Sequence, residues 1–375
     1  MSIQQLASAS GALRLGNILP QARTIGSGDI AVRSCCSQWN ECQSDDIYVA
    51  IVGPEFDGHD FARDAVQRGA SAVVTERLLA IDLPQFIVGD SRLAFGQICH
   101  ALAGQPSQRL QTTGVSGSNG KTVTSHLIQQ IFLAAGADVG LLSTISTATE
   151  NESKADFSAP GLADRLSTMV LEDCSHAVVE IPSEALAQHT LAGTKLDTAV
   201  LTNIHYDDLG FHRTKENYRR ANLRLLDYLK PTGVAVLNAD DPASHFLLGE
   251  IDAPVLTVAM KQQAELTARI VERQAAWQTF LLTAGGQSVA VRTNIIGDQH
   301  VYNCLSAAAV GLSNGIELPV IARGLENAST VPGRLERVDC GQPFNVWIDS
   351  AKSVRQLATA LQSIRKVTKG KVWCV

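Results

Sequence analysis

Short apolar runs alternate with helical patterns along this chain from about residue 46 onward. Three early runs have the length and composition of strands: "DIYVAIVG" (46–53), "SAVVTE" (71–76) and "PQFIVGD" (84–90). The segments between and after them, "HDFARDAVQRGA" (59–70) and "SRLAFGQICHALAG" (91–104), have helical periodicity. Alternation of strands and helices predicts an α/β architecture with a largely parallel sheet.

A second alternating series follows the polar segment "AGQPSQRLQ" (103–111), which contains glycine and proline and is typical of a linker. Its expected strands are "TTGVSGS" (112–118), "HAVVEIP" (176–182), "DTAVLTNI" (197–204) and "GVAVLNADD" (233–241), and its expected helices are 122–137 and 299–316. Each strand ends in polar residues, and α/β sheets bind ligands at the carboxyl ends of parallel strands. We therefore expect separate domains at 1–105 and 106–332, followed by a third segment at 333–375.

The third segment reads as a strand "FNVWIDS" (344–350), a helix "VRQLATALQSIRKV" (354–367) and a last strand "KVWCV" (371–375). Only 43 residues follow Pro332. A complete α/β domain needs roughly 100 residues. We expect this segment to pack against the central domain or to be loosely held.

Composition narrows the class of protein. The chain has 375 residues, 45% hydrophobic and 18% charged, which is ordinary for a globular protein. A net charge of −6 argues against nucleic-acid binding. The N-terminus does not resemble a signal peptide, and apolar runs of about 18 residues are lacking. We expect a cytoplasmic monomer that binds neither nucleic acid nor membrane.

The eight cysteines do not follow a metal-binding pattern, because C-x-x-C pairs and zinc-ligand spacing are absent. Most lie in apolar stretches, which predicts buried, reduced thiols. Cys35, Cys36 and Cys42 are close in sequence, but adjacent cysteines rarely chelate one ion together, so we expect no thiolate metal site.

The segment "TTGVSGSNGKTVTSHLI" (112–128) carries the clearest chemistry. A glycine-rich turn between a strand and a helix exposes backbone N–H groups to an anion, a lysine neutralises phosphate, and a hydroxyl at the next position ligates Mg²⁺. The strict P-loop pattern requires glycine where Val115 stands. The alternatives are a tight structural turn with a surface lysine, or a dinucleotide loop, for which G-x-G-x-x-G is missing.

The variant loop "GVSGSNGKT" (114–122) resembles the ATP-binding loop of the Mur ligases, the amide-forming enzymes of peptidoglycan synthesis. Seven further segments resemble the branch of this family that adds the third residue of the stem peptide: 57–74, 178–186, 202–221, 237–242, 301–312, 331–336 and 347–354. The resemblance implies an N-terminal α/β UDP-binding domain, a central P-loop domain with a mainly parallel sheet, and the start of a Rossmann-like C-terminal domain.

The resemblance also implies an activity, with ATP and Mg²⁺ as cofactors. In the family, ATP phosphorylates the carboxylate of UDP-linked muramyl dipeptide, and an amino acid (diaminopimelate or lysine) attacks the acyl phosphate. By resemblance Lys121 and Glu180 are catalytic, while Thr122, Glu180 and Asp208 hold metal. The expected ATP contacts are Gly117, Ser118, Asn119, Gly120, Lys121, Thr122, Asn303, Arg334 and Asp349, and the expected substrate contacts are Ser158, Ser183 and His189. Structural roles remain open for Glu180 as a solvated strand-end carboxylate, Asn303 as a helix-face amide and Arg334 as a surface charge.

The chain departs from the family pattern at the second metal. The family has histidine at the position of Asp208 and a carbamylated lysine at that of Asn222. Asparagine cannot be carbamylated, and Lys215 lies two helical turns away, about 10 Å. An alternative is therefore a degenerate relative that binds nucleotide without ligating, and a stand-alone P-loop kinase or ATPase has little support beyond the loop. We expect the 375-residue chain by itself to form no tripeptide and at most to release phosphate slowly.

Overall fold

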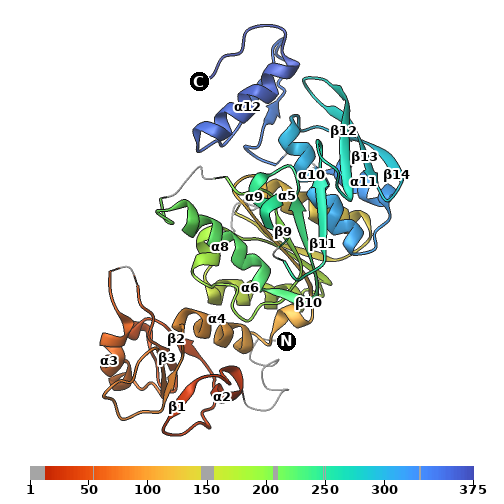
Figure 1. Cartoon of the computed structure of the whole chain (residues 1–375). Coiled ribbons are helices and arrows are strands. Elements are labelled where there is room, and N and C mark those ends of the chain that lie inside the picture. The colour runs from red at the N-terminus through yellow and green to blue at the C-terminus, as the bar shows by residue number, and fades with distance from the viewer. Residues whose placement is uncertain are drawn as a thin grey trace. The chain divides into compact units, whose positions relative to one another are not determined.

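The computed structural model describes residues 13–53, 55–144, 156–205, 210–247, 249, 251–328 and 331–375. They form two compact units, and Figure 1 traces the chain through both. The first comprises Met1–Arg109, Asp156–Glu172 and Ala185–Lys195, and the second Leu110–Ala155, Asp173–Glu184 and Leu196–Val375. Two segments from within the expected central range thus belong to the first unit, and residues 333–375 belong to the second.

The first unit is built on a five-stranded sheet with the order β1-β5-β4-β3-β2, in which only the edge strand β1 is antiparallel to its neighbour. Apolar side chains alternate between two clusters, one on each face; Val49 and Phe86 belong to one, Tyr48 and Val73 to the other. The elements are α2 (Leu15–Ile18), β1 (Arg23–Ile25), β2 (Cys35–Cys36), η1 (Trp39–Glu41), β3 (Ile47–Val49), η2 (Gly58–Phe61), α3 (Ala62–Gln67), β4 (Ala72–Thr75), β5 (Gln85–Ile87), α4 (Ser91–Leu102), η3 (Pro106–Gln108) and α6 (Ala159–Leu171).

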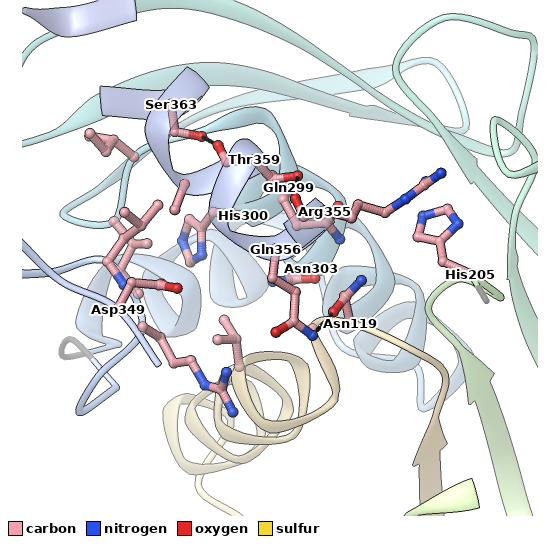
Figure 2. A pocket seen from close by; sticks show the side chains of 17 residues that line it. Asn119, His205, Gln299, His300, Asn303, Asp349, Arg355, Gln356, Thr359 and Ser363 are labelled. Carbon is pink, nitrogen blue, oxygen red and sulfur yellow. Dashed lines mark hydrogen bonds between the residues drawn. The ribbon is translucent and has the colours of Figure 1, made fainter. Parts of the chain in front are cut away.

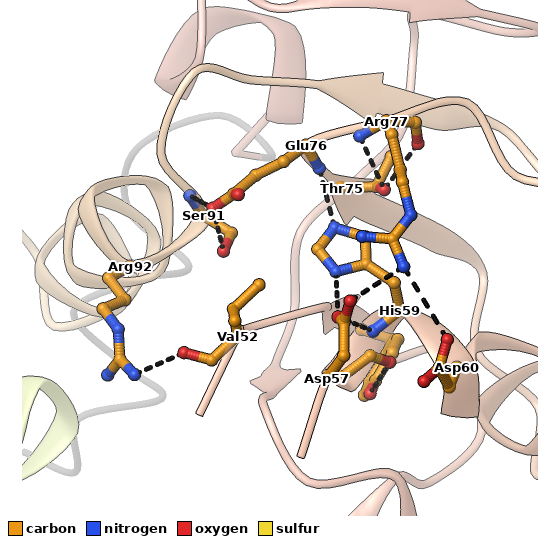
Figure 3. Close-up of polar contacts among 11 residues, drawn as sticks. Val52, Asp57, His59, Asp60, Thr75, Glu76, Arg77, Ser91 and Arg92 are labelled. Carbon is orange, nitrogen blue, oxygen red and sulfur yellow. Dashed lines mark hydrogen bonds and ion pairs between the residues drawn. The ribbon is translucent and has the colours of Figure 1, made fainter. Parts of the chain in front are cut away.

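A polar network joins the loop after β3 to the end of β4 (Figure 3). The buried ring of His59 accepts a 2.9 Å hydrogen bond from the backbone N–H of Glu76, so its proton lies on Nδ1, 2.5 Å from Asp57 Oδ1. Arg77 donates to the other Asp57 oxygen at 2.8 Å. Glu76 in turn accepts from the backbone and hydroxyl of Ser91, which starts α4. This network holds together turns that are far apart in the sequence.

The second unit contains a nine-stranded sheet with the order β14-β13-β12-β11-β10-β9-β6-β8-β7, parallel from β7 to β12 and antiparallel at the β13–β14 edge. The predicted α/β class and the mainly parallel central sheet are confirmed. The strands are β6 (Gln111–Ser116), β7 (Val139–Leu142), β8 (His176–Glu180), β9 (Leu196–Leu201), β10 (Leu229–Asn238), β11 (Val255–Ala259), β12 (Leu266–Arg273), β13 (Gln278–Ala284) and β14 (Gln287–Thr293).

Helices cover both faces of this sheet. Val115 of β6 packs in the main core with α5 and α10, whereas a side chain at the adjacent Gly114 would meet Leu225 of α8 at 3.2 Å. Because neighbouring strand residues face opposite sides, α8 covers the second face. The helices are α5 (Lys121–Ala134), α7 (Ser183–Ala187), α8 (Lys215–Asp227), α9 (Pro242–Leu247), α10 (Asp298–Ser313) and α11 (Leu318–Asn327). Among the described residues, none of the helices is long and apolar enough to cross a membrane.

The last segment forms a hairpin and a helix, β15 (Glu336–Val338), β16 (Val346–Ile348) and α12 (Val354–Val367). The helix lies against α10: Lys366 Nζ donates to Asp298 at 2.7 Å. The expected final strand over 371–375 is wrong, because these residues are irregular and Trp373 is 82% exposed. A strand needs a neighbour to accept its backbone hydrogen bonds, and this segment does not reach one.

Candidate functional site

The loop between β6 and α5 has the backbone of an anion-binding turn. Gly117 and Gly120 adopt φ values of +129° and +88°, which side chains other than glycine rarely adopt. A Cβ at Gly117 would collide with Thr202 Oγ1, and one at Gly120 would lie 3.1 Å from the Asn303 amide carbon. Both glycines are thus required by the backbone conformation and by close neighbours. The loop delivers the chain to the N-terminus of α5, where unpaired N–H groups attract anions.

Lys121 folds back over this loop, and its Nζ donates a 2.8 Å hydrogen bond to the carbonyl of Gly117. Burial lowers the pKa of Lys121 below the ordinary lysine value, and the neighbouring Glu180 and Glu184 oppose this change. Arg334 and Lys352 lower the pKa further. A phosphate bound by the loop would favour the charged form of this lysine.

Glu180 ends β8 beside the loop and is 2% exposed. Its Oε1 accepts from the Thr122 hydroxyl at 2.9 Å, and its Oε2 accepts from Ser143 Oγ at 2.6 Å and from the Thr144 backbone at 2.9 Å. A buried carboxylate surrounded by hydroxyl groups is an all-oxygen donor set, which is what Mg²⁺ prefers. The residues present therefore fit that ion, with Thr122 and Glu180 as ligands.

The end of β9 fixes the loop from the other side. The backbone N–H of Asn119 donates to Asn203 Oδ1 at 3.0 Å, and Asn203 Nδ2 donates to the Asn119 carbonyl at 2.9 Å. The Ser118 hydroxyl lies 2.7 Å from both Tyr218 Oη and the His205 carbonyl. The loop conformation is thus held before any ligand arrives, which lowers the entropic cost of binding.

A cavity of about 190 Å³ adjoins the loop (Figure 2). Five of the residues expected at the nucleotide line it: Asn119, Gly120, Asn303, Arg334 and Asp349. Residues from α12 complete its wall, and the Gln356 amide donates to Asn119 Oδ1 at 2.6 Å. Asn303 is 4% exposed, yet its Oδ1 has no hydrogen-bond partner. The same holds for Nδ1 of His300, whose pKa burial lowers to about 3, so the ring is neutral.

Unsatisfied buried polar atoms are costly, about 1–3 kcal/mol each. Two of them in one cavity wall are explained by a polar ligand that supplies the missing hydrogen bonds. The cavity is smaller than the 300–1,000 Å³ typical of whole ligands. It therefore suits one flat part of a larger molecule whose anionic part would lie along the loop.

The position expected for a carbamylated lysine contains a fully buried Asn222 on α8. Its Nδ2 donates to the Tyr218 carbonyl at 2.9 Å, one turn back along the helix, and its Oδ1 lies 3.3 Å from the Ser116 hydroxyl. The amide is thus satisfied internally and carries no charge for a second metal. Asp208, the other expected second-metal ligand, lies outside the described residues.

The three expected substrate residues do not lie in one unit. Ser158 caps α6 and His189 lies 3.5 Å from Asp90, both in the first unit. Ser183 belongs to the second unit, where its Oγ lies 3.0 Å from Nε2 of the buried His212. Their roles stay predictions.

Comparison with known proteins identifies the family. The model of the Mur ligase middle domain matches residues 115–311. The chain belongs to the Mur ligase family. A UDP-N-acetylmuramoyl-L-alanyl-D-glutamate–2,6-diaminopimelate ligase from Geobacillus thermodenitrificans is 37% identical over 339 residues, 88% of this chain and 69% of the relative. A UDP-N-acetylmuramyl-tripeptide synthetase from a Roseiflexus species is 33% identical over 352 residues, with the same coverages.

Solved structures show the same Mur ligase fold. A diaminopimelate-adding ligase aligns with a TM-score of 0.81 over 95% of this chain and 74% of its own, at 22% identity. The MurF ligase from Thermotoga maritima, in complex with ADP, aligns with a TM-score of 0.59 over 88% of this chain and 74% of its own, at 20% identity. The matches extend over both compact units of this Mur ligase.

Several members of the site were missed from sequence. Ser143 and Thr144 hold Glu180, Asn203 holds Asn119, and Gln356 reaches the loop from α12. Asn203 lies at the end of the predicted strand 197–204 and could have been found by the rule that polar residues at strand ends gather at one edge. The others are ordinary polar residues whose proximity depends on tertiary packing.

Proposed function

We propose that this Mur ligase is an ATP-dependent amide ligase of peptidoglycan precursor synthesis. In the proposed reaction it activates the carboxylate of UDP-linked muramyl dipeptide as an acyl phosphate and joins it to an amino acid. The observation that carries the proposal is the juxtaposition of Lys121, Thr122 and Glu180 at one loop, with the Thr122 hydroxyl 2.9 Å from the carboxylate. Family membership supplies the substrate class, since relatives are named as ligases of this dipeptide.

Each residue of the site has a proposed role that follows from its position. Backbone N–H groups of Gly117–Gly120 and the Lys121 ammonium neutralise phosphate charge, which is most of what a protein contributes to phosphoryl transfer. Thr122 and Glu180 would hold Mg²⁺, which supplies charge neutralisation at the phosphates when bound. Asn303 and His300 line the cavity in which the base would lie, and Arg334 and Asp349 complete its wall.

The remaining assignments belong to the same proposal. Asp208 is proposed as a second metal ligand, and Ser158, Ser183 and His189 as contacts of the UDP-linked dipeptide. Diaminopimelate or lysine is proposed as the incoming amine. The domain limits 1–105, 106–332 and 333–375 are proposed as the functional division of the chain, with a cytoplasmic, monomeric enzyme as the working form.

A second candidate rests on Asn222. Its buried, internally satisfied amide cannot carry a carbamate, so a second metal would lack its anionic ligand pair. This observation favours a relative that binds Mg·ATP without forming the amide. The two candidates predict equal nucleotide binding and differ only in dipeptide-dependent chemistry.

The experiment that separates them supplies ATP and the incoming amino acid (diaminopimelate or lysine), follows ADP release with and without the UDP-linked dipeptide, and detects the amide product by mass. Dipeptide-dependent ADP release that disappears in Lys121→Ala supports the ligase. Intact Mg·ATP binding without any dipeptide-dependent release supports the second candidate.

A further inference from the structure

Three side chains able to ligate a metal meet in the loop that joins β2 and β3 of the first unit. The ligand atoms of Cys36, Cys42 and Asp46 all lie within 4.8 Å of one another. The residues are 8%, 2% and 6% exposed. In the part of the chain that the structure describes, no second group of three histidine, cysteine or acidic side chains gathers in this way.

Local structure brings these residues together despite spacing that does not match a zinc motif. Cys36 ends β2 and pairs in register with Tyr48 of β3, so the chain must return on itself between them. The 3-10 turn η1 makes this return, and Cys42 follows it with its N–H bonded to the Trp39 carbonyl at 3.2 Å. Asp46 then lies next to the start of β3.

The carboxylate of Asp46 is fixed in place by the loop itself. Its Oδ2 accepts from the Gln43 backbone at 2.8 Å, and its Oδ1 accepts from the Ser34 hydroxyl. A buried carboxylate is costly unless it is paired, and the side chains that cluster with Asp46 are thiols rather than cations. A bound cation would supply the missing positive charge.

We propose that Cys36, Cys42 and Asp46 bind a thiophilic divalent cation, with Zn²⁺ the ion that the donor set fits best. Two sulfur atoms and a carboxylate suit Zn²⁺ and disfavour Mg²⁺. Tetrahedral Zn²⁺ with bonds of about 2.3 Å to sulfur places donor atoms about 3.8 Å apart. The three groups therefore have to close by at most about 1 Å, and the two thiols lose their protons as they ligate.

The cluster borders open space. Cys36 and Asp46 line a cavity of about 1,130 Å³ in the first unit, together with Cys35 and Gln43. Solvent there can complete the tetrahedron, as in sites with three protein ligands. The ion would fix one wall of this cavity, and it belongs to a site separate from Thr122 and Glu180.

The chain offers its own control in a second pair of thiols. Cys35 lies next to Cys36, but the side chains of adjacent strand residues face opposite sides. Its Sγ lies 3.8 Å from Cys99 Sγ, where α4 packs on the sheet. Neither Cys35 nor Cys99 belongs to the cluster of Cys36, Cys42 and Asp46, so Cys99→Ser should leave the proposed metal site intact.

The test is metal binding to the reduced full-length chain, with Co²⁺ as a spectroscopic probe and Zn²⁺ measured by competition against a chromogenic chelator. We expect one equivalent of Zn²⁺, and thiolate-to-cobalt charge-transfer absorption in the near-ultraviolet. Cys42→Ser and Asp46→Asn should each weaken Zn²⁺ binding at least about 100-fold, since even indirect partners of a metal cost 10–100-fold. Cys99→Ser and the exposed Cys340→Ser should bind as the wild type does.

Asp46→Asn serves as the conservative variant, because the amide can still accept from Gln43. Circular dichroism must show both site variants folded, and the cobalt spectrum then reports on ligation directly. Absence of the charge-transfer band in the reduced wild type would overturn the proposal. So would a bound Zn²⁺ equivalent that survives in both Cys42→Ser and Asp46→Asn.

Discussion

The Thr122 hydroxyl donates a 2.9 Å hydrogen bond to Glu180 Oε1, and so joins the first turn of α5 to the end of β8. The two residues are 58 positions apart in sequence. The bond places the hydroxyl that we propose as a magnesium ligand and a buried carboxylate beside the loop on which Lys121 rests. Nucleotide binding by this Mur ligase can be tested at each of these groups.

Replacing Lys121 by alanine should weaken Mg·ATP binding by about 10- to 100-fold, because a hydrogen bond to a charged group contributes about 1.5–3 kcal/mol. Isothermal titration calorimetry measures the change. Calorimetry at alkaline pH provides a second readout. Burial holds the pKa of Lys121 below 10.5, and a bound phosphate raises this pKa. ATP binding should therefore be accompanied by proton uptake. The affinity for ATP should fall as the pH rises through the pKa that Lys121 has in the ligand-free protein. Equal affinities for wild type and Lys121→Ala would show that the loop does not bind the phosphates.

Glu180→Gln should abolish the Mg²⁺ dependence of ATP affinity while leaving the fold intact, since glutamine preserves volume but loses the charge that a divalent cation requires. Titrations with Mg²⁺ and with a chelator present measure this dependence. The control is Glu184→Gln at an exposed neighbouring position, and this variant should keep the Mg²⁺ dependence of ATP affinity. A Glu180→Gln protein that responds to Mg²⁺ as the wild type does would remove Glu180 from the metal site.

Gly117→Ala should destabilise the second unit by more than the about 1–3 kcal/mol that an unfavourable backbone conformation costs by itself, and should remove nucleotide binding. The added methyl group would also lie 2.8 Å from the Asn203 carbonyl oxygen. Gly136→Ala is the matched control, because Gly136 has a φ of +82° but nothing within 4 Å of the added Cβ. Urea unfolding measures the free energy of unfolding of both variants, and calorimetry measures their ATP affinity. The comparison separates backbone strain at positive φ from the collision of the added methyl group. Similar losses in the two variants would contradict the argument from close approach.

Asn222→Lys should create a carbamylated lysine when bicarbonate is present. The position is fully buried beside Ser116 and Tyr218, so an uncharged lysine there can react with carbon dioxide and gain an anionic oxygen pair. Intact-protein mass spectrometry of wild type and variant detects the adduct. Lys230 is not expected to react, because its Nζ pairs with Asp197 at 2.8 Å. An adduct on Lys215 or Lys230 of the wild type would mean that Asn222 does not occupy the carbamate position.

Asp57→Asn should destabilise the first unit at neutral pH by about 1 kcal/mol, and the difference should vanish in acid. Partial burial alone would raise the pKa of Asp57. Hydrogen bonds from the His59 backbone, Arg77 and the His59 ring outweigh that effect and lower it from 3.8 to about 2. A carboxyl group whose pKa is lower in the folded than in the unfolded state stabilises the fold at any pH above the unfolded-state pKa. The effect of Asp57 is therefore complete above about pH 4 and is lost as the pH falls through about 2.

Hydrogen exchange of the segment 55–77, measured between pH 2 and 7, reports on this network. Asp60→Asn is the control, since the Asp60 side chain is 74% exposed and lies 3.7 Å from Arg77. An Asp57→Asn effect that is the same at pH 2 and pH 7 would assign it to packing rather than charge.

Much of the fold was predictable because local patterns and tertiary structure agree. The apolar runs around Val178, Val200 and Val236 became buried parallel strands, and the glycine loop lies at the expected strand-to-helix turn. The hairpins of β12 to β14 were not predicted, although their half-exposed strands alternate polar with apolar residues, the pattern of strands with one buried face. The final segment 371–375 has strand composition but lacks a neighbour to pair with.

The site was partly predictable for a similar reason. Asn119 and Gly120 belong to the expected loop, while Asn303, Arg334 and Asp349 were expected only from resemblance, and all five line one cavity. Of the cysteines in apolar stretches, burial was predicted correctly for Cys99 and Cys304 but not for Cys374, which is exposed. The grouping of Cys36 and Cys42 with Asp46 depends on how η1 turns, which spacing alone does not reveal.

The most direct test of the proposed ligase is to trap the activated carboxylate. The purified chain is incubated with Mg·ATP, UDP-linked muramyl dipeptide and hydroxylamine, and the hydroxamate is detected by mass alongside ADP. The proposal predicts a hydroxamate that requires both ATP and dipeptide and is abolished in Lys121→Ala. Normal Mg·ATP binding with neither hydroxamate nor dipeptide-dependent ADP would contradict it, and would identify the chain as a nucleotide-binding relative that does not activate the carboxylate.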